Sequence, residues 1–364
     1  MKKNLTYSQS GVNYDLLDKL KRMAQSAGAT LTFAEHFEGG GEGESAAIIK
    51  LRNDYIIAFV QEGLGTKNLV ADAMLSITGK TYYDDIAQDT VAMIINDLIT
   101  VGAKPICVSA YWAIGSEDWL KNEKRMKDLV NGWKKACELS SAGWIGGETP
   151  ILSGVVNPKT VDLSGSSLGV IEPHTRLTLG EKLQAGDAVI LFSSNGIHAN
   201  GLTLARKLAD QLPQGYETKL PSGKSYGESL LEPSTIYARL VKDMFDNNID
   251  LHYMVHITGH GWRKLMRNKK DFSYRMTEVP PVPDVLKFVQ EQAGFSDEEA
   301  YATFNMGAGF AIFVSQNDVE KVQKISNKHA IKSYNAGVVE KGPKQVIIEP
   351  KNIIFKADSL NLRA

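Results

Sequence analysis

Residues 59–67 read Phe-Val-Gln-Glu-Gly-Leu-Gly-Thr-Lys, and they end an apolar, strand-like run that begins at Tyr55. In this stretch a carboxylate, Glu62, precedes two glycines, a hydroxyl and Lys67. Glycines let backbone amides approach an anion, a lysine adds positive charge, and a carboxylate binds Mg²⁺. The pattern is not a Walker loop, which has four residues between its first glycine and Gly-Lys-Ser/Thr. The segment favours a site for a metal-bound nucleoside triphosphate, and a glycine turn that closes a hairpin is the alternative.

The composition indicates a globular protein without a charged surface for a polymer. The 364 residues are 43% hydrophobic and 23% charged, and this length suits two domains. The formal net charge of −1 attracts neither nucleic acid nor a membrane surface, so neither is expected as a partner. No apolar run approaches the ~18 residues of a membrane span, and the first residues are too polar for a signal peptide. Cys107 and Cys137 have no metal-binding spacing, which fits a reducing cytoplasm.

A long helix is predicted from residue 83 or 84 to about residue 101, and it has a polar stripe. At about 100° per residue, Asp85, Asp89 and Asn96 fall within roughly 40° of one another, and Asp97 lies to one side. The remaining residues are so rich in aliphatic side chains that most of the helix must be buried, where unpaired carboxylates are costly. A hard cation would satisfy these acids. A solvent-facing strip is the alternative.

Several other strands are followed by glycine-containing loops. The strand 188–192 leads through residues 193–201 into a helix expected at 202–209, which is a typical anion site because backbone amides are free there. His198 lies in this loop and either contacts a ligand or packs structurally. Residues 144–150 repeat the strand, glycine and carboxylate order around Glu148. The glycine-rich residues 39–44 form either a mobile linker or a cover for a nucleotide.

In chain order, these motifs resemble those of the phosphoribosylformylglycinamidine cyclo-ligase family, the aminoimidazole ribonucleotide synthetases. The likeness extends to the wider superfamily of selenophosphate synthetase and thiamine-phosphate kinase, and it covers nearly the full chain. The matching segments are Tyr7–Val12, Glu62–Lys67, Asp89–Leu98, Gly146–Thr149, Ser194–Gly201, His256–Gly259 and Thr303–Gly307. Among these, the segment Asp89–Leu98 is the most specific, since it matches Asp-x-Val-Ala-Met-x-x-Asn-Asp-Leu.

The resemblance implies an α+β fold and a biosynthetic reaction. It implies a two-domain PurM-like protomer, with an N-terminal ATP-binding and dimerisation domain at 1–171 and a C-terminal α/β sandwich domain at 172–364. The N-terminal domains would form a β-barrel across a homodimer. ATP would phosphorylate the amide oxygen of formylglycinamidine ribonucleotide, and ring closure would give 5-aminoimidazole ribonucleotide, ADP and phosphate. The implied cofactors are ATP and Mg²⁺, in a cytoplasmic ligase of purine biosynthesis.

The residues expected in the site follow from the matched motifs. The expected metal ligands are Glu62, Asp89, Asp97 and, more weakly, Glu148. The expected nucleotide contacts are Gly63, Gly65, Thr66, Lys67, Asn96, Gly196, Asn200 and Gly201. The expected catalytic residues are His198, Asn195, Lys67 and Asp97.

This chain departs from the family pattern at charged positions. Gln9 and Asn13 stand where the family has aspartates, Glu62 and Ser109 each replace an aspartate, and His260 interrupts a glycine triplet. The longer Glu62 side chain shifts a carboxylate that octahedral Mg²⁺ would need in place. These changes keep two alternatives open. One is a superfamily kinase that phosphorylates another small acceptor, and the other is a non-catalytic nucleotide-binding subunit.

Overall fold

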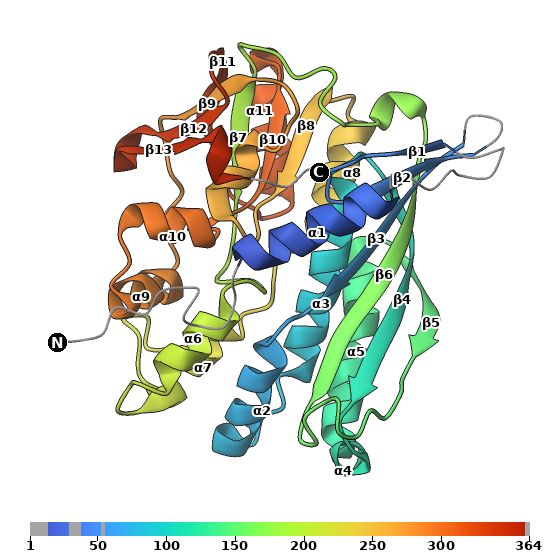
Figure 1. Ribbon diagram of the computed structural model, residues 1–364, viewed down its shortest axis with the longest axis vertical. Coiled ribbons are helices and arrows are strands. Elements are labelled where there is room, and N and C mark those ends of the chain that lie inside the picture. Colours follow the sequence, from blue (N-terminus) through green and yellow to red (C-terminus); the bar gives the residue numbers. More distant parts are fainter. Residues whose placement is uncertain (1–13, 29–37, 52–54, 361–364) are drawn as a thin grey trace.

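The computed structural model describes residues 14–28, 38–51 and 55–360. Two β-sheets organise these residues, one in each half of the chain (Figure 1). The strands of the first half are β1 (Glu38–Gly40), β2 (Ala47–Lys50), β3 (Ile56–Gly63), β4 (Lys104–Ile114), β5 (Gly143–Glu148) and β6 (Val161–Ile171). Its helices are α1 (Tyr14–Gly28), α2 (Lys67–Thr78), α3 (Tyr83–Ile99), α4 (Glu117–Leu120) and α5 (Glu123–Ser140).

The second half contains seven strands and six α-helices within the described residues. The strands are β7 (Ala188–Ser193), β8 (Leu251–His256), β9 (Phe272–Met276), β10 (Ala308–Val314), β11 (Ser333–Lys341), β12 (Gln345–Ile348) and β13 (Ile353–Lys356). The helices are α6 (Leu202–Ala209), α7 (Tyr226–Leu230), α8 (Ala238–Asp246), α9 (Asp284–Ala293), α10 (Asp297–Thr303) and α11 (Val319–Lys328), with a 3₁₀ helix, η5, at Gly261–Met266.

The N-terminal sheet has the strand order β1-β2-β3-β6-β4-β5, and only the β4–β5 pair is parallel. Burial alternates along β6 because successive side chains of a strand point to opposite faces. On β3, Ala58 and Val60 are buried on the face that α3 covers, and Glu62 shares that face by the same alternation. The strand therefore directs Glu62 toward the interior of the molecule.

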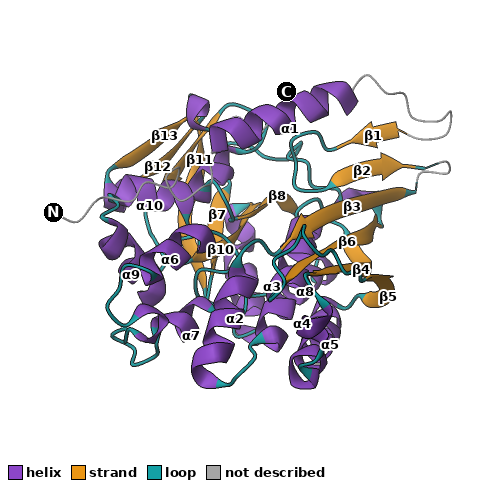
Figure 2. Ribbon diagram, turned by 60° about the horizontal axis from the view of Figure 1, so that its bottom comes forward, coloured by secondary structure: helices purple, strands orange, loops and turns teal. Residues whose placement is uncertain are grey.

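The opposite face of the N-terminal sheet has no helix over it among the described residues (Figure 2). Gln61, Ser166 and Ser109 are paired across three neighbouring strands on this face, and in the next row Phe59 is 43% exposed. Strands β1 and β5 are the two edges, so the described sheet is open and does not close into a barrel by itself.

The C-terminal sheet has the order β13-β12-β9-β11-β7-β10-β8, with β12 and β9 parallel and the other pairs antiparallel. Every residue of the inner strand β10 and of the edge strand β8 is buried, and most of these residues are apolar. Such strands form the core of the second half, and the loops that leave them at His256 and Ser193 point toward the first half.

Helix α3 lies between the two halves, and nearly all of its residues are buried. Asp89 and Asn96 have no exposed surface, so the solvent-strip interpretation of this helix is wrong for them. Helix α5 crosses α3 closely at Gly132, where a Cβ would lie 2.4 Å from the Asp84 carbonyl oxygen. Apolar residues recur at helical spacing over residues 118–139, but the helix is interrupted there, since Asn122 separates α4 from α5 and accepts a hydrogen bond from the Arg125 amide at 3.0 Å.

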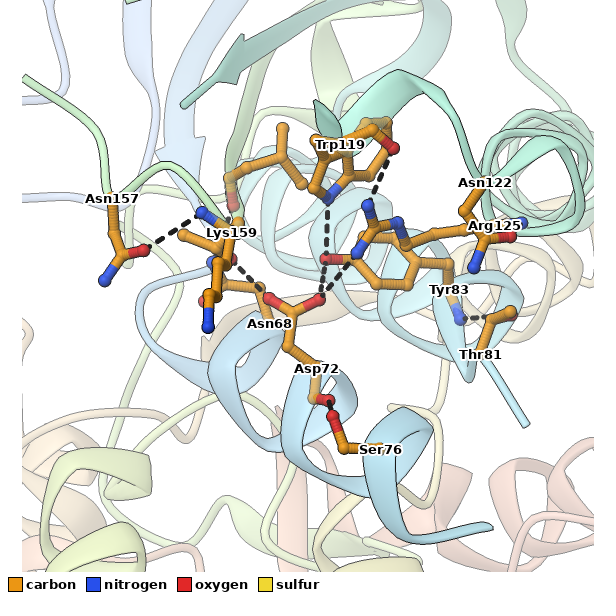
Figure 3. A network of polar contacts seen from close by, with 12 residues as sticks. Asn68, Asp72, Ser76, Thr81, Tyr83, Trp119, Asn122, Arg125, Asn157 and Lys159 are labelled. Carbon is orange, nitrogen blue, oxygen red and sulfur yellow. Dashed lines mark hydrogen bonds and ion pairs between the residues drawn. The ribbon is translucent and has the colours of Figure 1, made fainter. Parts of the chain in front are cut away.

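A polar network fixes α2 against α3 and α5 (Figure 3). Asp72 of α2 accepts hydrogen bonds from the Tyr83 hydroxyl at 2.8 Å and from Thr160 Oγ1 at 2.5 Å, and its Oδ1 lies 3.4 Å from Arg125 Nη1. The Arg125 guanidinium also packs on the ring of Trp119, 4.4 Å from its centroid. Burial raises the pKa of Asp72, although these donors oppose the shift. The network fixes the middle of α2, at Asp72, against α3 and α5.

The glycine-rich loop is bound to the second half of the chain. Arg267 Nε donates to the Gly43 carbonyl at 2.6 Å, and the Tyr253 hydroxyl donates to Glu44 Oε2 at 2.8 Å. Because these bonds cross between the two halves, the mobile-linker interpretation of this loop does not agree with the structure.

Candidate active site

Strand β3 passes through a glycine turn directly into helix α2. Gly65 has a φ of +73°, a left-handed conformation that glycine adopts without strain, and a Cβ at this position would meet nothing within 4 Å. Thr66 is the residue before α2, and its side chain makes no capping bond. The chain does not form the hairpin that was the alternative for this segment. The turn and the first amides of α2 have the arrangement that binds phosphate groups in other proteins.

A second helix begins beside this turn. Thr66 Oγ1 lies 3.4 Å from Thr203 Oγ1 in the first turn of α6. Gly201 precedes α6 with a φ of +86°, and a Cβ there would lie 2.2 Å from the Phe304 ring. The positive ends of two helix dipoles therefore meet at one place, which is favourable for a polyanion.

Lys67 is completely buried. Its Nζ lies 2.7 Å from Asp89 Oδ2, and it donates to the carbonyls of Glu232 at 2.9 Å and His198 at 3.0 Å. Asp89 Oδ1 accepts from the backbone amide and the hydroxyl of Ser234 at 2.8 and 2.5 Å. Burial raises the pKa of Asp89, although Lys67 and Ser234 oppose the shift. Both residues thus have partners within the protein in this structure.

Asp97 is paired with a histidine from the second half. Asp97 Oδ1 lies 2.7 Å from His256 Nδ1, and both side chains are buried. Burial alone would raise the pKa of Asp97, but the hydrogen bond from His256 and the charge of Lys264 lower it. Burial lowers the pKa of His256, so the neutral ring donates its Nδ1 proton to an ionised carboxylate. This bond fixes the orientation of both groups.

Glu62 and Lys264 lie close to this pair. Burial and the charge of Asp97 raise the pKa of Glu62 to about 7, while Lys264 opposes the shift. Burial lowers the pKa of Lys264 to about 8. Two neighbouring carboxylates whose charges repel one another fit a divalent cation, which would remove the repulsion. Mg²⁺ commonly takes one or two protein carboxylates and completes its shell with phosphate oxygens and water.

The four predicted metal ligands do not gather in one place. Among the described residues, no group of three or more His, Cys, Asp or Glu side chains could hold a metal ion. Glu148 is exposed and lines a groove of about 480 Å³ together with Gln61 and Ser109. That groove is on the open face of the N-terminal sheet, whereas Glu62 shares the covered face. The structure therefore brings only Glu62 and Asp97 together, and the roles of all four acids stay predictions.

His198 and Asn195 lie in the loop between β7 and α6. His198 has a φ of +59°, and its Nε2 lies 3.1 Å from Asn195 Oδ1. Asn195 donates its Nδ2 protons to the Pro233 carbonyl, so its Oδ1 accepts the imidazole proton. Burial and the neighbouring His256 lower the pKa of His198 to about 3, so the ring is neutral. Its Nδ1 is buried and has no hydrogen-bond partner among the described residues.

Three other predicted nucleotide contacts, Asn96, Gly196 and Asn200, differ in how far their polar groups are already bonded within the protein. Asn96 is buried and bonded to the backbone of Thr235 and Tyr237 at 2.9 and 3.0 Å. The Gly196 carbonyl accepts from Asn305 Nδ2 at 2.9 Å, which anchors the loop. Asn200 Nδ2 lies 3.9 Å from the Met93 sulfur, a weak contact that leaves its oxygen available.

Sequence reasoning overlooked several residues of this site. His256 belongs to a motif that was recognised, yet its pairing with Asp97 depends on the fold. Nothing in the sequence marks Lys264 or Ser234 as a site residue. Lysines among other basic residues, and serines that follow a proline, are common on protein surfaces. Gln9 and Asn13 lie outside the described residues.

Two family models match the chain. The N-terminal domain model of AIR synthase related protein matches residues 43–171, and the C-terminal domain model matches residues 184–349. The chain belongs to the AIR synthase related protein family. Two curated members, both named phosphoribosylformylglycinamidine cyclo-ligase, have high coverage. The protein from Pyrococcus furiosus is 37% identical over 96% of this chain and 99% of its own length. The one from Methanobrevibacter smithii is 35% identical over 88% and 90%.

Solved structures of other AIR synthase related folds agree in architecture. A HypE–HypF complex structure has a TM-score of 0.63 at 16% identity, covering 92% of this chain and 99% of that one. AaThiL, solved with AMPPCP and TMP, has a TM-score of 0.59 at 16% identity, covering 94% and 95%. At such identities the likeness shows the fold alone. The two-domain, PurM-like α+β fold is confirmed, while the boundary at 171/172 stays a prediction.

The described residues contain no helix that is long and apolar enough to cross a membrane. The two cysteines, Cys107 and Cys137, are both free.

Proposed function

We propose that this protein closes the imidazole ring of 5-aminoimidazole ribonucleotide from formylglycinamidine ribonucleotide, consuming ATP and releasing ADP and phosphate. The high coverage of relatives named for this reaction supports the proposal. The observation that carries it in the structure is the meeting of two helix N-termini at Thr66 and Thr203, at the end of the strand that carries Glu62, whose carboxylate interacts with that of Asp97. This combination suits a polyphosphate and its metal ion. A neighbour of the same fold, AaThiL, was solved with AMPPCP, an ATP analogue.

The described residues suggest how the nucleotide would be held. The amides of Gly63 and Gly65 and the first turn of α6 would bind phosphate oxygens, and Glu62 with Asp97 would hold Mg²⁺. The metal supplies charge neutralisation on the transferred phosphoryl group. Lys264 lies near both acids and would add a second positive charge to the same region. Positioning and charge neutralisation are the main contributions a protein makes to phosphoryl transfer.

The second half of the site would hold the ribonucleotide. In the reaction the γ-phosphoryl group goes to the amide oxygen, the amidine nitrogen attacks the activated carbon and loses a proton, and phosphate leaves with that oxygen. His198 keeps a neutral ring with a free Nδ1, so it would accept a hydrogen bond from an N–H of the substrate and orient it. With a pKa of about 3 it is a poor proton acceptor at neutral pH.

The test is ADP release from Mg·ATP with and without formylglycinamidine ribonucleotide, measured together with the aminoimidazole product. We expect one ADP and one product per ribonucleotide consumed. ADP release that ignores the ribonucleotide would favour a kinase with another acceptor. Binding of ATP without turnover against any acceptor would favour a nucleotide-binding subunit.

We also propose that the protein is a cytoplasmic homodimer in which two open N-terminal sheets face each other and close a β-barrel. The exposed Phe59 and the partly exposed Leu168 lie on the uncovered face, in one row across β3 and β6. An uncovered apolar sheet face is a typical interaction surface. The two free cysteines support a reducing compartment.

A further inference from the structure

The polar stripe of α3 lies against residues 232–237, which connect α7 to α8 and contain no helix or strand. We call residues 232–237 the connecting segment. It belongs to the second half of the chain, whereas α3 belongs to the first. A buried segment without secondary structure leaves its backbone amides and carbonyls without regular partners, and each unpaired group costs free energy.

Side chains of α3 supply those partners. Gln88 Nε2 donates to the Ser234 carbonyl at 3.0 Å, and Asp89 Oδ1 accepts from the Ser234 amide at 2.8 Å. Two helical turns further along α3, Asn96 donates to the Thr235 carbonyl at 2.9 Å and accepts from the Tyr237 amide at 3.0 Å. The stripe therefore pairs with a peptide backbone much as a neighbouring strand would.

Lys67 completes the contact from the start of α2. An ammonium group has three protons, and Lys67 has three partners: Asp89, the Glu232 carbonyl and the His198 carbonyl. Its side chain has no exposed surface. Contact with a phosphate group would require Lys67 to give up one of these three partners. Loss of a carbonyl would release the connecting segment or the His198 loop, and loss of Asp89 would leave a buried carboxylate without its counter-ion, which is strongly unfavourable.

The connecting segment in turn holds the His198 loop. The Pro233 carbonyl accepts from Asn195 Nδ2, and Thr235 Oγ1 donates to Asn195 Oδ1 at 3.2 Å. The same Asn195 oxygen lies 3.1 Å from His198 Nε2. Lys67 holds this loop a second time, through the carbonyl of His198, whose left-handed backbone is unusual for a residue with a Cβ.

We propose that Lys67, Asp89 and Asn96 are positioning residues that hold the connecting segment and, through Asn195, set the orientation of the His198 ring. They are then neither phosphate nor metal ligands, and the metal-binding acids reduce to Glu62 and Asp97. The part of this inference that concerns turnover rests on the proposed cyclo-ligase function. The structural part does not.

Two variants of the full-length protein test the proposal. Thr235→Val removes one hydroxyl from a half-buried site and keeps the side-chain shape, so it folds. The double variant Lys67→Met/Asp89→Asn removes both buried charges together and leaves neither unpaired. The matched control is Lys121→Met/Asp118→Asn, an exposed ion pair at 2.5 Å on α4 and the residue after it.

The deciding readout is amide hydrogen exchange, which needs no turnover. We expect both test variants to raise exchange in peptides covering 194–201 by at least about tenfold, with α5 and the control unchanged. Binding of a non-hydrolysable ATP analogue with Mg²⁺ should stay within about tenfold of wild type. If the protein has cyclo-ligase activity, kcat should fall about 10–100-fold with the KM for ATP nearly constant.

Unchanged exchange at 194–201 in Thr235→Val would overturn the proposal even if the double variant failed to fold. A loss of analogue binding of a hundredfold or more in the double variant, with that exchange unchanged, would restore Lys67 and Asp89 as ligands. Because exchange and binding are measured without the ribonucleotide, the positioning role is tested even in a protein that fails as a cyclo-ligase.

Discussion

Glu62 is a carboxyl group whose charge changes near neutral pH. Its pKa is raised to about 7 by burial and by Asp97, so the group takes up a proton as the pH falls below that value. A metal ligand must be deprotonated, and protons therefore compete with Mg²⁺.

We predict that the apparent affinity for Mg²⁺ falls about tenfold from pH 8 to pH 6, as expected for one competing proton with a pKa of about 7. Glu62→Gln should bind Mg²⁺ more weakly throughout and show a flatter pH dependence. Magnesium titrations of analogue binding at each pH measure this, with the exposed Glu138→Gln as the control. A wild-type affinity that is constant over this range would exclude Glu62 as a ligand.

Asp97 has two roles in the proposed site, because it is bonded to His256 and would hold the metal. We predict that Asp97→Asn, which keeps the shape and loses the charge, lowers turnover by at least about 10²-fold while the unfolding midpoint changes little. Steady-state kinetics and urea unfolding measure the two effects. Near-normal turnover in this variant would show that the acid is not a metal ligand.

The residue scale is also where the sequence was least informative. Asp89 and Asn96 were grouped with Asp97 because helical spacing places them on similar sides of α3. Spacing cannot reveal that their partners are backbone groups about 140 positions away, near Ser234 and Tyr237. A polar residue on an apolar helix looks the same in a sequence whether it binds a metal or a distant peptide.

Single elements were more predictable than their partners. The helix at 202–209 has the predicted bounds, since periodic apolar residues and the preceding Gly201 define it locally. The break between α4 and α5 is hard to see in the sequence, because helical periodicity continues across it and only the Asn122 cap marks the start of α5.

The loop before α6 provides a test at the scale of an element. We predict that Gly201→Ala destabilises the protein by about 2–4 kcal/mol, because a left-handed alanine is strained and its Cβ would overlap Phe304. Gly223→Ala is the matched control, since its φ is +84° but nothing lies within 4 Å. It should lose only about 1–2 kcal/mol. Urea unfolding measures both, and equal losses would mean that the Phe304 contact is unimportant.

The uncovered face of the N-terminal sheet determines how two protomers would meet. In a two-fold dimer each residue of the interface appears twice, so a single substitution acts on both sides.

We predict that the wild-type protein is a dimer and that Phe59→Asp is monomeric at micromolar concentration, because two charges would be buried at the apolar row of Phe59 and Leu168. Light scattering after size-exclusion chromatography measures the mass. Ile354→Asp is the control, since Ile354 is 53% exposed and lies on β13 of the other sheet. A dimer that survives Phe59→Asp would place the interface elsewhere.

Helix α3 binds the connecting segment mainly through the peptide groups of that segment. Substitutions in the segment and substitutions on α3 should therefore have different consequences. Every amino acid except proline offers the same amide and carbonyl, so positions such as Ile236 and Glu232 are free to change identity without loss of the pairing. The side chains of Gln88, Asp89 and Asn96 on α3 cannot change in this way. Even a change from asparagine to aspartate replaces a hydrogen-bond donor with an acceptor. The sequence of the connecting segment can therefore vary in evolution without loss of the contact, whereas the side chains of α3 that pair with it must stay the same.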